Sequence, residues 1–117
     1  MTQNILLQRL EGVAALSVAI TLYATVGASW WMFALLLFVP DVSMIGYWFG
    51  NQRGQMVYNI VHTYVLPLFT ALLGYSLGQP MVLSLSLIWL AHIGMDRTLG
   101  YGLKEAQGFK FTHLGNL

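Results

Sequence analysis

Four long apolar segments joined by short polar links constrain this chain more than any other feature. Each is close to the length of about 20 mainly apolar residues that a helix needs to cross a bilayer, and they cover residues 5–28, 30–50, 55–77 and 80–102. Charged residues make up 8% of the chain, whereas a typical soluble domain has about 25%. The sequence therefore predicts an integral membrane protein, and the low charge argues against a nucleic-acid-binding surface.

The links between the apolar segments predict how the helices are connected. Residues 27–29 and 78–80 make two tight links, and residues 50–54 make a short polar loop. Because short connections favour antiparallel neighbours, we expect an all-α fold with one domain. This domain would be a bundle of four antiparallel transmembrane helices, followed by a tail at residues 103–117. A cleaved signal peptide is not expected, because the apolar stretch after Arg9 exceeds the about 7 to 15 residues of a signal-peptide core.

The basic residues predict the orientation of this bundle. Arg9, Arg53, Lys104 and Lys110 fall on the side that holds both termini and the central loop, whereas the two tight links contain no charged residue. Lys and Arg are enriched on the cytoplasmic side of membrane proteins. Both termini are therefore expected in the cytoplasm, with membrane lipids as immediate partners. The sequence leaves open whether the chain forms a homo-oligomer.

Ionisable residues within the apolar segments mark a candidate site. Each segment has at least one, and the set is Glu11, Asp41, His62, His92 and Asp96. Placing an ionisable side chain in hydrocarbon costs at least about 2.5 kcal/mol, so such residues usually have a partner and a function. His92 and Asp96 are four residues apart and share one helix face. All five belong to the cytoplasmic half of the predicted bundle, so we expect a shared polar cavity there.

Two prolines predict bends close to these groups. Pro40 directly precedes Asp41, and Pro67 follows His62 by five residues. Proline removes a backbone donor and bends or breaks a helix interior, so we expect the second helix to bend at Asp41 and the third to kink at Pro67. Such breaks are tolerated in a membrane where they line a polar cavity.

The first of three functional hypotheses is a metal-dependent membrane enzyme. Imidazole and carboxylate groups on facing helices are a pattern by which bundles hold divalent metals such as Zn, Mn or Fe. Glu11 would be an additional ligand or general base, and Arg97 would bind a phosphate or carboxylate of a lipid-like substrate. The predicted metal ligands are Asp41, His62, His92 and Asp96.

Two alternatives remain open from the sequence. Intramembrane acidic residues and histidines also form proton relays, which would make the chain a small proton-coupled transporter. Alternatively, the polar layer only specifies helix packing, and the protein has a structural or accessory role without catalytic activity. Under that second alternative, Asp96 pairs with Arg97 or His92, and Asp41 with His62. Separately, Arg97 could extend to the membrane interface and bind no ligand.

The C-terminal tail admits two arrangements. Its apolar residues Phe109, Phe111 and Leu114 could rest on the membrane surface. Alternatively, the tail folds back over the cavity, and His113 adds a further imidazole to it.

Several short motifs together resemble one known family. The chain resembles the bacterial membrane-protein family called domain of unknown function 4260, and the motifs that carry the likeness are Leu10-Glu11-Gly12, Pro40-Asp41, Tyr58-Asn59, His62-Thr63-Tyr64, Ala91-His92-Ile93-Gly94-Met95-Asp96-Arg97, Leu99-Gly100-Tyr101-Gly102-Leu103-Lys104 and Thr112-His113-Leu114-Gly115. This resemblance implies a small multi-pass protein of the bacterial inner membrane, and it assigns no activity. The family positions here are Glu11, Asp41, His62, His92, Asp96, Arg97 and His113.

Overall fold

The computed structural model describes residues 3–41 and 50–100, together with strand residues 104–105, 108–112 and 115–116. The described helices are α1 (Gln3–Val26), α2 (Trp30–Leu36), α3 (Asn51–Val61), α4 (Val65–Ser76) and α5 (Pro80–Leu99). A short 3₁₀ turn at residues 39–41 follows α2. In the tail, the strands are β1 (Lys104–Glu105), β2 (Gly108–Thr112) and β3 (Gly115–Asn116).

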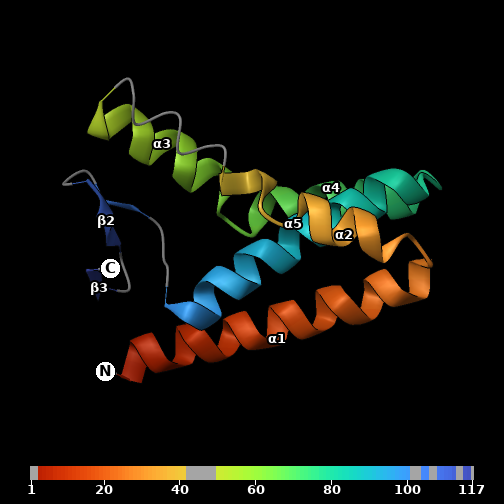
Figure 1. Cartoon of the computed structure of the whole chain (residues 1–117), viewed down its shortest axis with the longest axis horizontal. Coiled ribbons are helices and arrows are strands. Elements are labelled where there is room, and N and C mark those ends of the chain that lie inside the picture. The colour runs from red at the N-terminus through yellow and green to blue at the C-terminus, as the bar shows by residue number, and fades with distance from the viewer. Residues whose placement is uncertain (1–2, 42–49, 101–103, 106–107, 113–114, 117) are drawn as a thin grey trace.

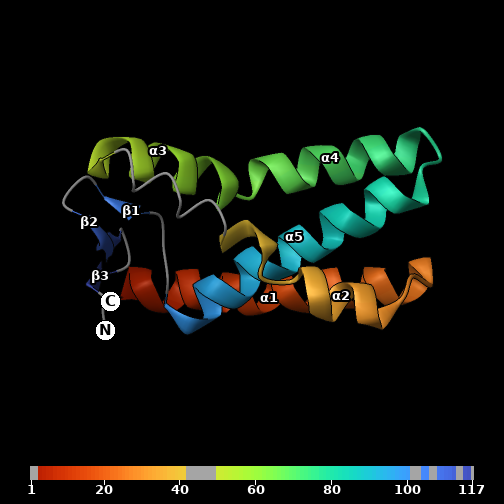
Figure 2. The same ribbon diagram turned by 45° about the horizontal axis from the view of Figure 1, so that its top comes forward.

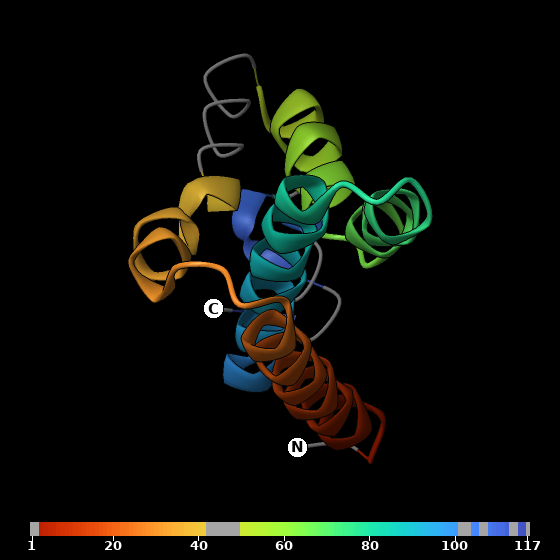
Figure 3. The same ribbon diagram turned by 90° about the vertical axis from the view of Figure 1, so that its right-hand side faces the viewer.

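Helix α5 is the centre of the fold. Figure 3 looks nearly along it and shows the other helices arranged around it. Half of its 20 residues are buried. One apolar cluster joins Leu87 and Ile88 of α5 to Tyr23 of α1, and side chains of α2 such as Met32 and Phe33 pack against this cluster. Because α5 is covered on several sides, its polar side chains lie inside the protein.

The chain reverses direction at both ends of the molecule. The turns that join α1 to α2 and α4 to α5 lie at one end (Figures 1 and 2). The N-terminal end of α1, the start of α3 and the strands lie at the opposite end. Ser29 caps α2, because its hydroxyl accepts hydrogen bonds from the backbone N–H groups of Trp31 and Met32. Gly27 and Gly78 have φ values of +80° and +66° in the two turns, a conformation that favours glycine.

Glycine allows α1 and α5 to cross at very short range. A Cβ atom added to Gly12 would lie 2.6 Å from Arg97 Cβ and 2.7 Å from the backbone nitrogen of Thr98. A Cβ atom at Gly94 would lie 2.7 Å from the backbone nitrogen of Leu16. Small residues that let two backbones approach are typical of helix contacts within membranes. This contact fixes the position of α5 along α1, and therefore also the position of the site residues that α5 carries.

The third predicted segment is divided into two helices. Helix α3 ends at Val61 and α4 begins at Val65, so the break comes directly at His62. A kink caused by Pro67 was predicted, and the break lies just before that proline, at residues 62–64. Pro67 is the third residue of α4. Because proline has no N–H to donate to the carbonyl four residues earlier and its ring clashes with that carbonyl, a helix that continued through residues 62–67 would be disfavoured.

The four predicted spans differ in whether the corresponding helices are long and apolar enough to cross a membrane. Within the described residues, Ile5–Val26 and Gln52–Ser76 are long and apolar enough to cross a membrane. Trp30–Asp41 is a shorter apolar helical segment, and the rest of the second predicted span lies outside the described residues apart from Gly50. Helix α5, which carries His92 and Asp96, is not among the candidate spans. A bundle with four spans therefore stays a prediction.

The tail contains a small antiparallel sheet that was not predicted from the sequence. The strand order is β1-β2-β3, with Lys104 opposite Thr112 and Phe111 opposite Asn116. The sheet lies beside α3 (Figure 2). Residues 3–41 and 50–100 are helices, 3₁₀ turn and links as the helical prediction requires. His113 lies outside the described residues, so its predicted alternatives stay open.

We expect Gly12→Ala to destabilise the protein, because its methyl group would lie within 3 Å of atoms of α5. Overpacking of this kind costs about 1–3 kcal/mol. Ala24→Val, at an exposed position of the same helix, is the control and should unfold near the wild-type temperature. Thermal unfolding in detergent measures both variants. A Gly12→Ala protein as stable as the wild type would contradict the close crossing.

Candidate metal centre

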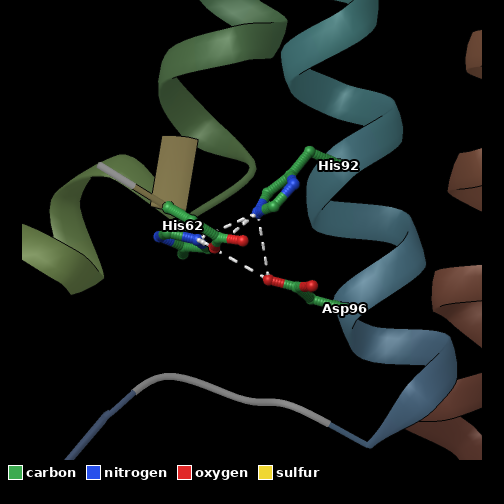
Figure 4. Close-up of side chains that lie close together, drawn as sticks. His62, His92 and Asp96 are labelled. Carbon is green, nitrogen blue, oxygen red and sulfur yellow. Dashed lines mark hydrogen bonds and ion pairs between the residues drawn. The ribbon is translucent and has the colours of Figure 1, made fainter. Parts of the chain in front are cut away.

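Four side chains from three parts of the chain converge on one point. Asp41 comes from the 3₁₀ turn after α2, His62 from the end of α3, and His92 and Asp96 from α5. Each residue offers one ligand atom, and these four atoms all lie within 4.8 Å of one another. Figure 4 shows His62, His92 and Asp96 pointing toward a common centre. Within the described chain, these four residues form a group that could hold a metal ion.

The distances within the group match the size of a metal coordination shell. His62 Nε2 lies 3.1 Å from His92 Nε2, 3.3 Å from Asp41 Oδ1 and 3.6 Å from Asp96 Oδ2. His92 Nε2 lies 3.1 Å from Asp41 Oδ1 and 3.2 Å from Asp96 Oδ2. Ligands about 2.0–2.1 Å from a tetrahedral metal ion are separated from one another by about 3.3–3.4 Å. Five of the six pairs of atoms therefore have about the spacing of a coordination shell, and the sixth pair, Asp41 with Asp96, lies within 4.8 Å.

Side chains of α5 stabilise the helix break that positions His62. The end of a helix leaves backbone carbonyls without partners in the helix. Here the Val61 carbonyl accepts a hydrogen bond of 2.6 Å from Trp89 Nε1, and the His62 carbonyl accepts one of 3.0 Å from Arg97 Nη2. Because both donors come from α5, the end of α3 is held against the helix that carries the other ligands.

The backbone of α3 sets the tautomer of His62. The Nδ1 atom of His62 lies 2.9 Å from the Tyr58 carbonyl oxygen, which can only accept, so Nδ1 carries the proton and donates. The lone pair is then on Nε2, the atom that faces the other three ligands. A backbone acceptor on the second ring nitrogen is the usual way to orient a metal-binding histidine. The Tyr58 ring also stacks on His62, with ring centroids 3.7 Å apart and planes inclined by 8°.

The donor set favours a cation at its centre. His62 Nε2 presents a lone pair to two carboxylates, and His92 Nε2 faces the same oxygens. His92 is fully buried, and its Nδ1 has no hydrogen-bond partner. His92 Nε2 lies within hydrogen-bond distance of both carboxylates and can donate to them, and a metal ion between the four atoms would replace this pairing. The chemistry and spacing of these residues therefore fit a metal ion.

Asp41 is the most exposed of the four candidate ligands. Its side chain is 37% exposed, compared with 13% for Asp96, 4% for His62 and 0% for His92. The two histidines and Asp96 therefore form the buried side of the group, and Asp41 forms its exposed, open side. A molecule that approaches the centre would meet Asp41 first.

The two residues predicted to be catalytic lie in different surroundings. Glu11 is exposed on α1 and is not part of the four-residue group. Arg97 is buried, donates to the His62 carbonyl, and has its guanidinium carbon 5.6 Å from the centre of the Tyr64 ring. The catalytic roles of both stay predictions. What the structure shows is that Arg97 helps to position His62.

The contacts that Trp89 and Tyr58 make at the site were not predicted from the sequence, in which Tyr58 was noted as part of the motif Tyr58-Asn59. Tyr58 precedes His62 by four residues and Trp89 precedes His92 by three, so each shares a helix face with a ligand. That spacing could have indicated a role for both residues. The hydrogen bond from Trp89 to α3 could not be predicted from the sequence, because it depends on how α3 and α5 pack.

We expect Arg97→Met to lower the free energy of unfolding by about 1.5–3 kcal/mol, the range for hydrogen bonds to charged groups. The variant removes the donor to the His62 carbonyl and leaves a buried acceptor unsatisfied. Arg53→Met changes an exposed arginine of α3 in the same way and serves as the control. Denaturant titration in detergent measures both. Equal losses in the two variants would argue against a specific role for Arg97 at the break.

Comparison with known proteins places the chain in a family. No curated protein and no solved structure gives a match to it. The family model described as "Domain of unknown function (DUF4260)" matches residues 5–117, so the chain belongs to this family, as its motifs indicated.

Proposed function

We propose that the protein is an integral membrane metalloenzyme that acts on a lipid-like substrate. The observation that carries this proposal is the convergence of two imidazoles and two carboxylates with ligand-like spacing. The site is enclosed by helices whose outer surfaces are apolar. The metal centre, the membrane location and the substrate class each have separate support.

The membrane location is supported by the apolar side chains on the outside of the molecule. Exposed large side chains occur on α1, α2 and α4, including Val18, Trp31, Leu35, Phe69 and Leu72. Soluble monomers rarely expose contiguous apolar patches larger than a few hundred Å². Surrounded by lipid, these side chains would need no protein partner. We propose that four helical passes cross the membrane, with α5 shielded by the others.

The basic residues support an orientation within that membrane. Arg9 lies on α1, Arg53 in the first turn of α3, Lys104 on β1 and Lys110 on β2. These elements meet at one end of the molecule (Figure 2). The positive-inside rule assigns such an end to the cytoplasm. We therefore propose that both termini face the cytoplasm of a bacterial cell and that the metal centre lies nearer to that side.

The ligand types limit which metal ions the site would bind and which reactions these ions would support. Imidazole and carboxylate together suit Zn, Mn or Fe. Such an ion acts as a Lewis acid on a carbonyl or phosphoryl oxygen and makes water a better nucleophile, so hydrolysis is the reaction class that we propose. Around it, His62 and His92 would hold the ion from the buried side. Asp41, at the open side, would be the ligand nearest to an incoming substrate.

The geometry favours this function over proton-coupled transport. A transporter that used the acidic residue of the first span would require Glu11 to communicate with the other ionisable groups. Glu11 is exposed, and the four-residue group does not include it. A purely structural role would need only pairwise contacts such as those between His92 and the two carboxylates, whereas four donor atoms within 4.8 Å of one another also form a complete ligand set. The metal-dependent function accounts for both observations.

We expect detergent-purified wild-type protein to contain about one equivalent of a divalent metal by elemental mass spectrometry, since four donors around one centre hold a single ion. His62→Ala, His92→Ala and Asp41→Asn should each lose most of it. Glu11→Gln is the control for Asp41→Asn, because it makes the same carboxylate-to-amide change outside the group. A metal-free wild-type protein after purification with added Zn, Mn and Fe would refute the proposal.

We expect a chelator to lower the thermal stability of the wild-type protein and added metal to restore it. A ligand that binds only the folded state stabilises it by about 2.7 kcal/mol at 100 times its dissociation constant. His92→Ala should show no such response, whereas Glu11→Gln should respond as the wild type does. Thermal unfolding with and without chelator gives the comparison. A stability of the wild type that is independent of metal would contradict the assignment of these ligands.

A further inference from the structure

We infer that an apolar groove beside the metal centre binds one hydrocarbon chain of the substrate, so that the group to be cleaved lies at Asp41. This inference rests on the proposed function, and it adds where the substrate binds and which of its parts is recognised. It is carried by the lining of the groove, by its position next to the ligands, and by the lack of hydrogen-bonding groups within it.

The groove lies between three parts of the chain. Its volume is about 540 Å³, within the range of about 300–1,000 Å³ that is common for small-molecule sites. Its lining is apolar throughout and comes from α2 with the 3₁₀ turn, from α3 and from α5, including Leu36, Val39, Val57, Val61, Leu85 and Trp89.

The groove is lined by direct sequence neighbours of two of the candidate ligands. Pro40, which lines it, directly precedes Asp41, and Val61, on the other wall, directly precedes His62. On α5, the lining begins at Leu85, seven residues before His92, which is about 10 Å along a helix. A chain in the groove would therefore end next to the most exposed of the candidate ligands.

The chemistry of the lining selects a hydrocarbon chain over a peptide. A bound peptide would bring backbone N–H and C=O groups that need partners in an apolar setting. The Trp89 indole N–H is already donated to the Val61 carbonyl, and the other lining side chains are aliphatic. A hydrocarbon chain carries no such groups.

A second groove provides an internal comparison. It also has a volume of about 540 Å³ and an apolar lining, and it lies between α1, α4 and α5. Its wall on α5 includes Leu83 and Leu87, which lie on the opposite face of that helix from Leu85. No residue that lines it is adjacent in sequence to a candidate ligand. Comparing hydrocarbon binding in the two grooves therefore distinguishes a specific site beside the candidate ligands from general contact with lipid.

The test uses palmitic acid that carries a photoactivatable diazirine, added to the full-length protein in detergent. We expect cross-links to the α3 and α5 walls of the first groove that saturate and are competed by unlabelled palmitic acid. Leu85→Trp should abolish this competed labelling by filling the groove. Leu72→Trp makes the same change in the second groove and should leave it intact. Both positions are exposed, so both variants should fold, and thermal unfolding checks this.

The outcomes separate the inference from the proposed function. Competed labelling that persists in folded Leu85→Trp would overturn the groove assignment, while the metal content of the wild type would still support the metal centre. Competed labelling in a protein that contains no metal would support the groove and refute the metalloenzyme. If Leu85→Trp instead converted a dimer to a monomer without changing the labelling, a second copy of the chain would cover the groove, and the inference would be wrong.

Discussion

The hydrogen bonds that α5 donates to the end of α3 are the interactions on which the candidate site depends. A helix that stops within a packed, apolar protein leaves carbonyl groups that must find donors. Trp89 and Arg97 supply two of them, to Val61 and His62. The break is therefore stabilised where His62 can face His92.

The arrangement around the break also explains why the site is ready to bind a cation. The Tyr58 carbonyl holds the proton of His62 on Nδ1, and the other ring nitrogen faces a carboxylate from each side. Helix α5 contributes two ligands on one face and is itself held at close range to α1 by Gly12 and Gly94. Ligand orientation and helix packing are thus parts of one arrangement, in which only Asp41 faces outward to a substantial degree.

Much of the fold was predictable because it depends on local sequence. Long apolar runs and short links gave the helical segments that match α1 and α5, and the spacing of His92 and Asp96 placed them on one face. The small sheet of the tail was not predicted, and the third helix breaks at His62, a few residues before Pro67. Pro67 disfavours a continuous helix there, but the donors from α5 that stabilise the break are not revealed by any local pattern. For the same reason, the sequence grouped Glu11 with the other ionisable residues, although its side chain is exposed on α1.

The sequence by itself determined that the chain is apolar and helical, that its charges are few, and that Glu11, Asp41, His62, His92 and Asp96 are ionisable residues whose burial in apolar segments is costly. These properties follow from composition and from the period of the helix. Only the tertiary structure decided that Asp41, His62, His92 and Asp96 meet within 4.8 Å of one another, that Glu11 lies exposed on α1, and that an apolar groove is lined by Pro40 and Val61, the neighbours of Asp41 and His62. Each of these depends on contacts between residues far apart in the chain, because helix crossings and helix ends are fixed by packing.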